Sequence, residues 1–190
     1  HFVLCVLAAE DADFYNHEGL DYPGIARALI RDLSEGRRAQ GASTITQQVV
    51  KLLLLTPERT LSRKIRELIL SRRLEQELTK DEILRLYVNH INFGHGRYGV
   101  QEAAQFYFGK DASELTLAES SLIAGVPQSP ARLSPRTHIE AARRRQSFVL
   151  NQLEQKREQY WPDLSQEEID AAREATPEII PRETQADTAP

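Results

Sequence analysis

The first residues that could do chemistry are acidic side chains near the start of the chain. If residues 2–17 are helical, a single stripe of that helix contains Val3, Leu7, Glu10, Phe14 and His17. A carboxylate on an apolar stripe is partly desolvated, which favours proton exchange near neutral pH, so Glu10 is a candidate general base or acid. The alternative is an ordinary acidic cluster at a helix end, formed with Asp11 and Asp13.

A second feature is the segment GASTITQQVVK, residues 41–51. On a helix that begins at Thr44, a narrow sector would hold Thr44, Gln47, Gln48 and Lys51. A mostly buried helix with one polar edge suits a cleft that binds sugar hydroxyls and phosphate. Gly41 ahead of the helix would let backbone amides approach an anion. The alternative is a helix cap followed by a strip that faces solvent.

Positive charge is concentrated between residues 51 and 73. The cations there are Lys51, Arg59, Arg63, Lys64, Arg66, Arg72 and Arg73. Guanidinium groups match phosphate oxygens bidentately, so this run favours a diphosphate site. The alternative is a solvated helix face on which Arg63 and Glu67, four residues apart, form a surface ion pair.

Helix signals dominate the rest of the chain. Capping boxes at Thr44, Thr79 and Thr116 mark helix starts, and Pro23 with Gly36 brackets another helix. We expect helices near residues 2–13, 21–36, 44–55, 60–78, 80–90, 98–108, 116–125 and 138–158, with loops at 36–41, 56–59, 92–99 and 127–135. No alternating strand pattern is convincing, so the predicted fold class is all-α.

Composition narrows the function classes. The chain has 190 residues and a net charge of -4, which argues against a nucleic-acid partner. His90 and His95 have no companions at metal-ligand spacing, and Cys5 is the only cysteine, so no metal site is expected. The longest apolar run, residues 2–9, is shorter than the roughly 20 residues of a membrane-spanning helix. Because the chain starts at His1 and lacks methionine, we expect an upstream segment.

Five ordered blocks of this chain resemble the family 51 glycosyltransferases, the peptidoglycan glycosyltransferase domains of class A penicillin-binding proteins and of monofunctional transglycosylases. The blocks are residues 8–19 (AAEDADFYNHEG), 41–51, 63–67 (RKIRE), 83–99 (ILRLYVNHINFGHGRYG) and 103–135. The resemblance implies a mainly helical, lysozyme-like, two-lobed domain over residues 1–155. Residues 156–190 would be a helical and proline-containing linker or the start of a following region.

The resemblance also assigns roles by position. It implies that Glu10 is the catalytic base and that Glu67 is a second essential carboxylate on the pyrophosphate side. Lys51, Arg59 and Arg27 match positions that hold phosphates. Other cleft-lining positions are matched by Ser43, Thr44, Gln47, Gln48, Arg63 and Lys64. The departures, Ala42 for a frequent glycine and His95 with Arg97 in the 94–99 loop, do not touch these roles.

The implied reaction is polymerisation of lipid II into β-1,4-linked glycan, with inversion at the donor anomeric carbon and release of undecaprenyl pyrophosphate. Glycoside hydrolysis needs two carboxylates, whereas a diphosphate leaving group needs cations, so a single poised Glu10 beside a basic run favours transfer. The alternative enzyme is a lysozyme-like lytic transglycosylase or muramidase. A non-catalytic module that binds anionic lipid would explain the basic run but not Glu10.

The resemblance implies several partners and a location. The partners are lipid II, the growing glycan strand and a membrane surface, and a C-terminal transpeptidase domain could follow in the parent chain. The expected location is the outer, periplasmic face of the bacterial cytoplasmic membrane, with an upstream transmembrane helix as anchor. No cofactor is required, and a divalent cation, Mg²⁺ or Mn²⁺, is an optional stimulant.

Overall fold

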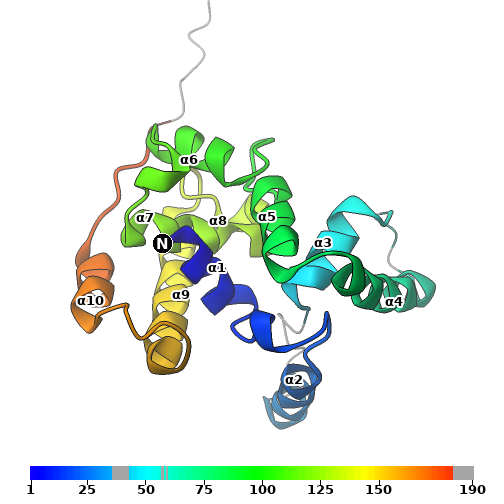
Figure 1. The fold of residues 1–190 in the computed structure, drawn as a ribbon. Helices are drawn as coiled ribbons and strands as arrows, with labels where there is room; N and C mark the ends of the chain where they lie inside the picture. Colours follow the sequence, from blue (N-terminus) through cyan, green and yellow to red (C-terminus); the bar gives the residue numbers. More distant parts are fainter. Residues whose placement is uncertain (36–42, 57, 59, 182–190) are drawn as a thin grey trace, which may run out of the picture.

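A computed structural model describes residues 1–35, 43–56, 58 and 60–181 of the chain, and for residues 28, 29 and 31–35 the backbone alone (Figure 1). The helices are α1 (Phe2–Glu10), α2 (Tyr22–Glu35), α3 (Ile45–Leu53), α4 (Leu61–Glu77), α5 (Lys80–His90), α6 (Val100–Phe108), α7 (Leu117–Ala124), α8 (Pro130–Leu133), α9 (Ile139–Tyr160) and α10 (Gln166–Glu174). Within these residues there is no strand, only an isolated bridge between Asn92 and Tyr98. The predicted all-α class is confirmed. The predicted loop at 36–41 lies outside the described residues.

Helix α1 is the centre of the core. It packs against α7 and α9, and Phe2, Cys5, Val6, Leu7 and Ala8 are all buried. An uninterrupted apolar run gives a helix that is buried on nearly every side, so the predicted single apolar stripe is wrong. The helix also ends at Glu10 and not near residue 13, because the chain turns away into a short 3-10 helix at Phe14–Asn16.

Local capping chemistry sets several helix starts. Thr44, Thr79 and Thr116 each form the predicted capping box, in which the threonine hydroxyl accepts a backbone N–H and the side chain three residues later bonds back. Each box satisfies amide groups that an uncapped helix would leave without partners. These three starts are therefore confirmed.

The proline-rich segment 127–135 is not the simple loop that its composition predicts. It contains a 3-10 helix at Val126–Gln128 and the short helix α8. Pro127 and Pro130 each occupy the first turn of one of these helices. Proline is compatible with that position because the first-turn N–H groups have no intrahelical partner.

The helices fall into two groups by their main packing partners, and both groups contribute to one hydrophobic core. Helices α1, α7, α9 and α10 pack together, while α3 packs against both α4 and α5 on the other side of the molecule (Figure 1). Helix α2 lies apart from both groups in the view of Figure 1. No helix of the described chain has the length and apolarity to cross a membrane.

Packing continues beyond residue 155. Helix α9 runs to Tyr160, and α10 packs against α7 and α9 with Ile169 and Ala172 buried. The Ile180 amide then donates a hydrogen bond to the Tyr107 carbonyl at 2.9 Å. Residues between 156 and 174 therefore contribute to the same hydrophobic core.

The glycine-rich loop 92–99 depends on Gly99. Gly99 has φ +84°, and a Cβ there would lie 2.5 Å from the Asn89 carbonyl oxygen. Gly96 has φ +73°, but a Cβ there would meet nothing within 4 Å. Of these two glycines, Gly99 is therefore the one that combines a positive φ with a close backbone approach.

We expect Gly99→Ala to destabilise the protein more than Gly96→Ala. The second variant should lose about 1–2 kcal/mol because alanine disfavours positive φ. Gly99→Ala adds a clash with backbone that cannot rotate away, so its loss should be at least ~2 kcal/mol larger. Urea unfolding of both variants measures the difference, and equal losses would show that the Asn89 contact is unimportant.

Candidate active site

A cavity of about 690 Å³ lies where the end of α1, the start of α2, α3 and α9 meet. Its polar lining residues include Glu10, Asp11, Asp13, Asp21, Arg27, Ser43, Thr44, Gln48, Lys51, Gln128, Ser129, Arg132, Arg145, Gln152 and Lys156. Cationic and anionic side chains are interspersed on these walls. Such a cavity suits a ligand that carries both hydroxyl groups and negative charge.

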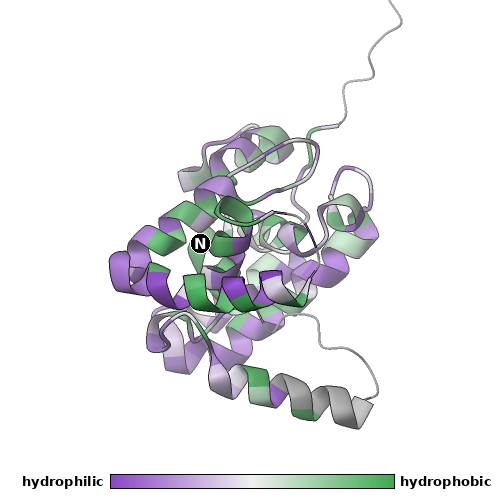
Figure 2. Cartoon of the chain, turned by 90° about the vertical axis from the view of Figure 1, so that its right-hand side faces the viewer, coloured by the Kyte–Doolittle hydropathy of each residue, from purple (hydrophilic) through white to green (hydrophobic). Residues whose placement is uncertain are grey.

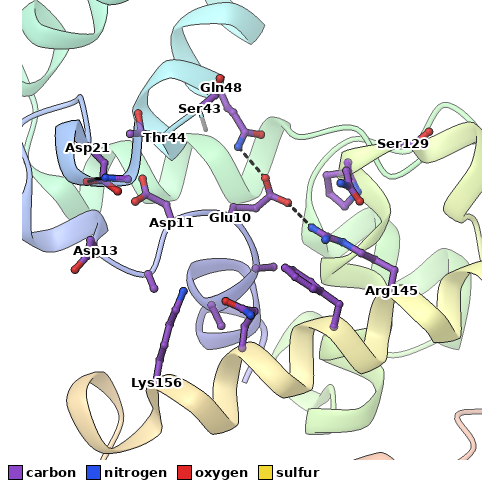
Figure 3. Close-up of a pocket in the computed structure, with 18 of the residues that line it drawn as sticks. Glu10, Asp11, Asp13, Asp21, Ser43, Thr44, Gln48, Ser129, Arg145 and Lys156 are labelled. Atoms are coloured by element: carbon purple, nitrogen blue, oxygen red, sulfur yellow. Dashed lines mark hydrogen bonds and ion pairs between the residues drawn. The ribbon is translucent and has the colours of Figure 1, made fainter. Parts of the chain in front are cut away.

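Glu10 is the last residue of α1, and its carboxylate is held from two sides (Figure 3). Gln48 Nε2 on α3 donates to one oxygen at 2.9 Å, and Arg145 on α9 donates to the other at 3.3 Å. The two partners approach from different helices, so the carboxylate has a fixed orientation on the cavity wall. Both contacts are made to the carboxylate oxygens, so the side chain cannot turn away from the cavity without losing them.

Tyr87 fixes the orientation of the Gln48 amide. Its hydroxyl donates to Gln48 Oε1 at 3.3 Å, which leaves Gln48 Nε2 to face Glu10. Burial raises the pKa of Tyr87 well above its usual value, and the negative charges of Glu10 and Asp11 raise it further. Tyr87 therefore stays protonated and acts as a donor at physiological pH.

Sequence reasoning missed Arg145 and Tyr87. Arg145 ends the run Arg143–Arg145, and such a run is typical of a solvated helix face. In the fold its side chain is 14% exposed, and its guanidinium carbon lies 4.3 Å from the centre of the Phe148 ring. Gly125 makes room for this side chain, since a Cβ there would lie 2.5 Å from Arg145 Cγ, but that proximity is known only from the fold.

Asp11 has a different task from Glu10 although the two are adjacent. The Ile45 amide donates to its Oδ2 at 2.9 Å, and His17 Nε2 lies 3.0 Å from its Oδ1. Thr44 in turn donates its hydroxyl to the Gly19 carbonyl at 2.7 Å. Residues 11–19 therefore hold the start of α3 in place. The predicted helical stripe that would hold both His17 and Glu10 is absent. His17 instead pairs with Asp11 and helps to hold the start of α3.

The outer edge of the cavity is a network of charged groups. Arg27 on α2 lies 3.5 Å from both Asp13 and Asp21, and the Tyr160 hydroxyl donates to Asp13. Burial and the Asp13 hydrogen bond raise the pKa of Tyr160 to about 12. Burial lowers the pKa of Lys156, while Asp13 opposes that shift. Arg27 is thus placed at the cavity, as predicted, but it contacts carboxylates.

The predicted polar edge of α3 divides between two tasks. Ser43, Thr44, Gln48 and Lys51 line the cavity. Gln47 does not: it is buried, and its Oε1 accepts the Thr44 amide at 2.9 Å as part of the capping box. Gln47, which was predicted to share the polar edge with Gln48, therefore closes the helix cap and does not face the cavity.

A second cluster lies on α4, apart from the cavity lining. The carboxylate of Glu67 is buried and accepts hydrogen bonds from Lys64 and from Arg63, the latter at 3.2 Å. The predicted ion pair between Arg63 and Glu67 is therefore present, but it is largely buried and not on the surface. Arg59, the remaining predicted phosphate ligand, lies outside the described residues.

Comparison with known proteins places this arrangement in a family. A family model described as "Transglycosylase" matches residues 1–154. Penicillin-binding protein 1A of Haemophilus influenzae is 48% identical over 87% of this chain and 19% of its own length. The Escherichia coli protein of the same name is 49% identical over 80% of this chain and 18% of its own length. The chain thus spans about a fifth of the length of these relatives.

A solved structure agrees with the sequence comparison. The crystal structure of penicillin-binding protein 1A from Haemophilus influenzae matches 74% of this chain and 17% of its own chain, with 28% identity and a TM-score of 0.50. The predicted resemblance and its lysozyme-like fold are confirmed. With a matching family model, close relatives and a matching fold, the chain belongs to the transglycosylase family of peptidoglycan glycosyltransferases.

Proposed function

We propose that this chain polymerises lipid II into β-1,4-linked glycan and releases undecaprenyl pyrophosphate. The observation that carries the proposal is the position of Glu10, a carboxylate held by Gln48 and Arg145 on the wall of a cavity that also contains Lys51. An oriented carboxylate can remove a proton from a sugar hydroxyl. Nearby cations can stabilise the negative charge of a diphosphate.

The transfer step follows from these groups. Glu10 takes the proton of the acceptor 4-hydroxyl as that oxygen forms a bond to the donor anomeric carbon. The bond from the anomeric carbon to the phosphate oxygen breaks, and its electron pair stays on the leaving diphosphate. Lys51 and Arg27 would stabilise that charge from the α3 and α2 sides of the cavity. Because the nucleophile attacks opposite the leaving group, the configuration inverts.

The engagement of the other carboxylates favours transfer over hydrolysis. A glycosidase needs a second carboxyl group free to act on the scissile bond. In the cavity, Asp11 is bound to His17 and to the Ile45 amide, and Asp13 is bound to Tyr160. Asp21 is bound to the Gly24 amide and to Arg27. All three are committed to structural contacts. A diphosphate leaving group departs without a carboxylic acid, so the one remaining carboxylate, Glu10, is sufficient.

The α4 cluster would support the same reaction from a distance. Glu67 holds the Lys64 and Arg63 side chains together, which would fix two cations for the pyrophosphate side of the substrate. The roles that the family resemblance gives to Ser43, Thr44, Gln47 and Arg59 stay predictions. A divalent cation also stays a prediction: among the described residues no group of three histidine, cysteine or acidic side chains could hold one, so no step is derived through it.

We further propose that the site works at a membrane surface. Leu61, Ile65 and Ile69 follow one another at four-residue spacing on α4 and are 86%, 58% and 50% exposed. Leu54, at the end of the neighbouring α3, is 56% exposed. Figure 2 views the molecule from the side on which α4 lies, and hydrophobic and hydrophilic residues alternate there. Apolar side chains with cations beside them suit an anionic lipid surface.

The longer protein is a separate proposal. Since the chain covers about a fifth of relatives named penicillin-binding protein 1A, we propose that a transpeptidase domain follows it in the parent chain. We propose, on the same ground, that an upstream membrane helix anchors it at the outer face of the cytoplasmic membrane.

The first test concerns the role of Glu10 as the general base. We expect Glu10→Gln to lower glycan synthesis from labelled lipid II by ~10²-fold or more, because the amide cannot accept the proton. Products are resolved by size and tested for muramidase digestion. Glu154→Gln, which removes a surface carboxylate paired with Arg173, is the matched control and should keep full activity.

Two outcomes contradict this assignment. Undiminished synthesis by a folded Glu10→Gln protein would move the base elsewhere. Cleavage of preformed glycan by the parent chain, without synthesis from lipid II, would favour the lysozyme-like lytic alternative.

The second test concerns the membrane surface. We expect the triple variant Leu61→Ser, Ile65→Ser and Ile69→Ser to bind vesicles of anionic phospholipid at least about tenfold more weakly, since partial burial of three such side chains stabilises binding. Ile139→Ser, on α9 and 37% exposed, is the control. Vesicle co-sedimentation measures both, and equal binding by parent and triple variant would refute this surface.

A further inference from the structure

Arg145 has more hydrogen-bonding capacity than the described protein uses. A guanidinium carries five N–H donors, yet this one makes a single hydrogen bond, to Glu10 at 3.3 Å. Its Nε is buried and has no hydrogen-bond partner among the described residues. The side chain is only 14% exposed, so water does not freely satisfy the other donors. A buried guanidinium with unused donors on a cavity wall is suited to bind an anion.

The stem of Arg145 is fixed while its charged end faces the cavity. A Cβ at Gly125 would lie 2.5 Å from Arg145 Cγ, so the backbone of α7 packs closely on the aliphatic part. The guanidinium carbon lies 4.3 Å from the centre of the Phe148 ring, which supports it from one side. Figure 3 shows the charged end directed towards Glu10. Any movement is therefore a short shift of the guanidinium and not a rotation of the whole side chain.

The ion pair with Glu10 opposes the proposed chemistry. While the pair exists, a proton that moves onto Glu10 neutralises the carboxylate and leaves the Arg145 charge without a partner. An unpaired charge in a half-enclosed cavity is unfavourable. Glu10 can accept a proton readily only if another anion balances Arg145. The diphosphate of the proposed substrate would enter the same cavity.

We propose that Arg145 is a positioning residue that exchanges Glu10 for phosphate oxygens when a diphosphate ligand enters the cavity. In the free protein Arg145 pairs with Glu10 and orients its carboxylate. Once its unused N–H groups bind the diphosphate, the Glu10 carboxylate is released to accept the hydroxyl proton. The base then becomes effective when the ligand is present. This inference rests on the proposed function, because it supplies the step by which substrate binding and proton removal are linked.

Titration with inorganic pyrophosphate tests the exchange without any turnover. If Glu10 and the anion compete for Arg145, Glu10→Gln should tighten pyrophosphate binding by about tenfold, a typical size for coupling between two ligands of one group. Arg145→Gln should weaken binding. In the double variant, Glu10→Gln should give no tightening relative to Arg145→Gln alone, since the group that both ligands share is gone. Calorimetry measures all four affinities.

Two further variants separate exchange from general electrostatics and from misfolding. Glu154→Gln disrupts a comparable ion pair, with Arg173 at 2.7 Å, outside the cavity and should leave the affinity unchanged. Arg145→Lys keeps the charge but loses the planar fork, so Glu10→Gln should still tighten binding in that background, by a smaller factor. Because Arg145→Lys also preserves the packing stem, it serves if Arg145→Gln does not fold.

Three results would overturn the exchange. They are no pyrophosphate binding by the unsubstituted chain, no tightening in Glu10→Gln, or the same tightening with and without Arg145. The last would show that any loss of negative charge in the cavity has this effect. Lipid II turnover is measured separately. The unsubstituted chain could bind pyrophosphate, with the expected coupling between Glu10 and the anion, and yet make no glycan. That result would contradict the proposed function and not the exchange.

Discussion

The hydrogen bond from the Ile45 amide to the Asp11 carboxylate joins the two groups of helices that form the site. Asp11 is 7% exposed and also contacts His17, so this bond at 2.9 Å is protected from water. Because Asp11 directly follows Glu10, the same bond fixes the end of α1 relative to the start of α3. Gln48, one turn further along α3, then reaches Glu10. The two groups share one hydrophobic core, and this bond sets how the carboxylate and its amide donor lie relative to each other within it.

The cavity therefore divides its carboxylates between structure and chemistry. Asp11, Asp13 and Asp21 are engaged by groups that hold local structure together, and Glu10 is held at the end of α1 by Gln48 and Arg145. This division agrees with transfer from a diphosphate, which needs one base and several cations. It agrees poorly with hydrolysis, which needs a pair of carboxyl groups at the bond. The physical logic and the family membership thus lead to the same reaction class.

Sequence alone predicts the local features of this fold well. Capping boxes at Thr44, Thr79 and Thr116 involve residues three apart, so their geometry depends on little else. Features that depend on how the helices pack were harder to predict from sequence. Glu10 was selected for an apolar stripe that does not exist, since α1 is buried on nearly all sides. The proline-rich segment formed short helices because proline fits their first turns.

The candidate site shows the same limit. Arg145 contacts Glu10 across 135 residues of sequence, and no local pattern distinguishes it from its neighbours Arg143 and Arg144. Gln47 and Gln48 share a helix sector, yet one closes the helix cap and the other faces the cavity. Which side chain takes which task depends on where Asp11 and Glu10 lie, and that is known only after the helices have packed.

The central claim is that the cavity transfers a sugar from a diphosphate donor to a hydroxyl acceptor. The most direct measurement incubates the chain with lipid II and quantifies both the undecaprenyl pyrophosphate released and the β-1,4 bonds formed. We expect one undecaprenyl pyrophosphate to be released for each new β-1,4 bond, in a polymer that muramidase digests. Shortening of added glycan strands, with no release of undecaprenyl pyrophosphate, would contradict transfer from a diphosphate donor.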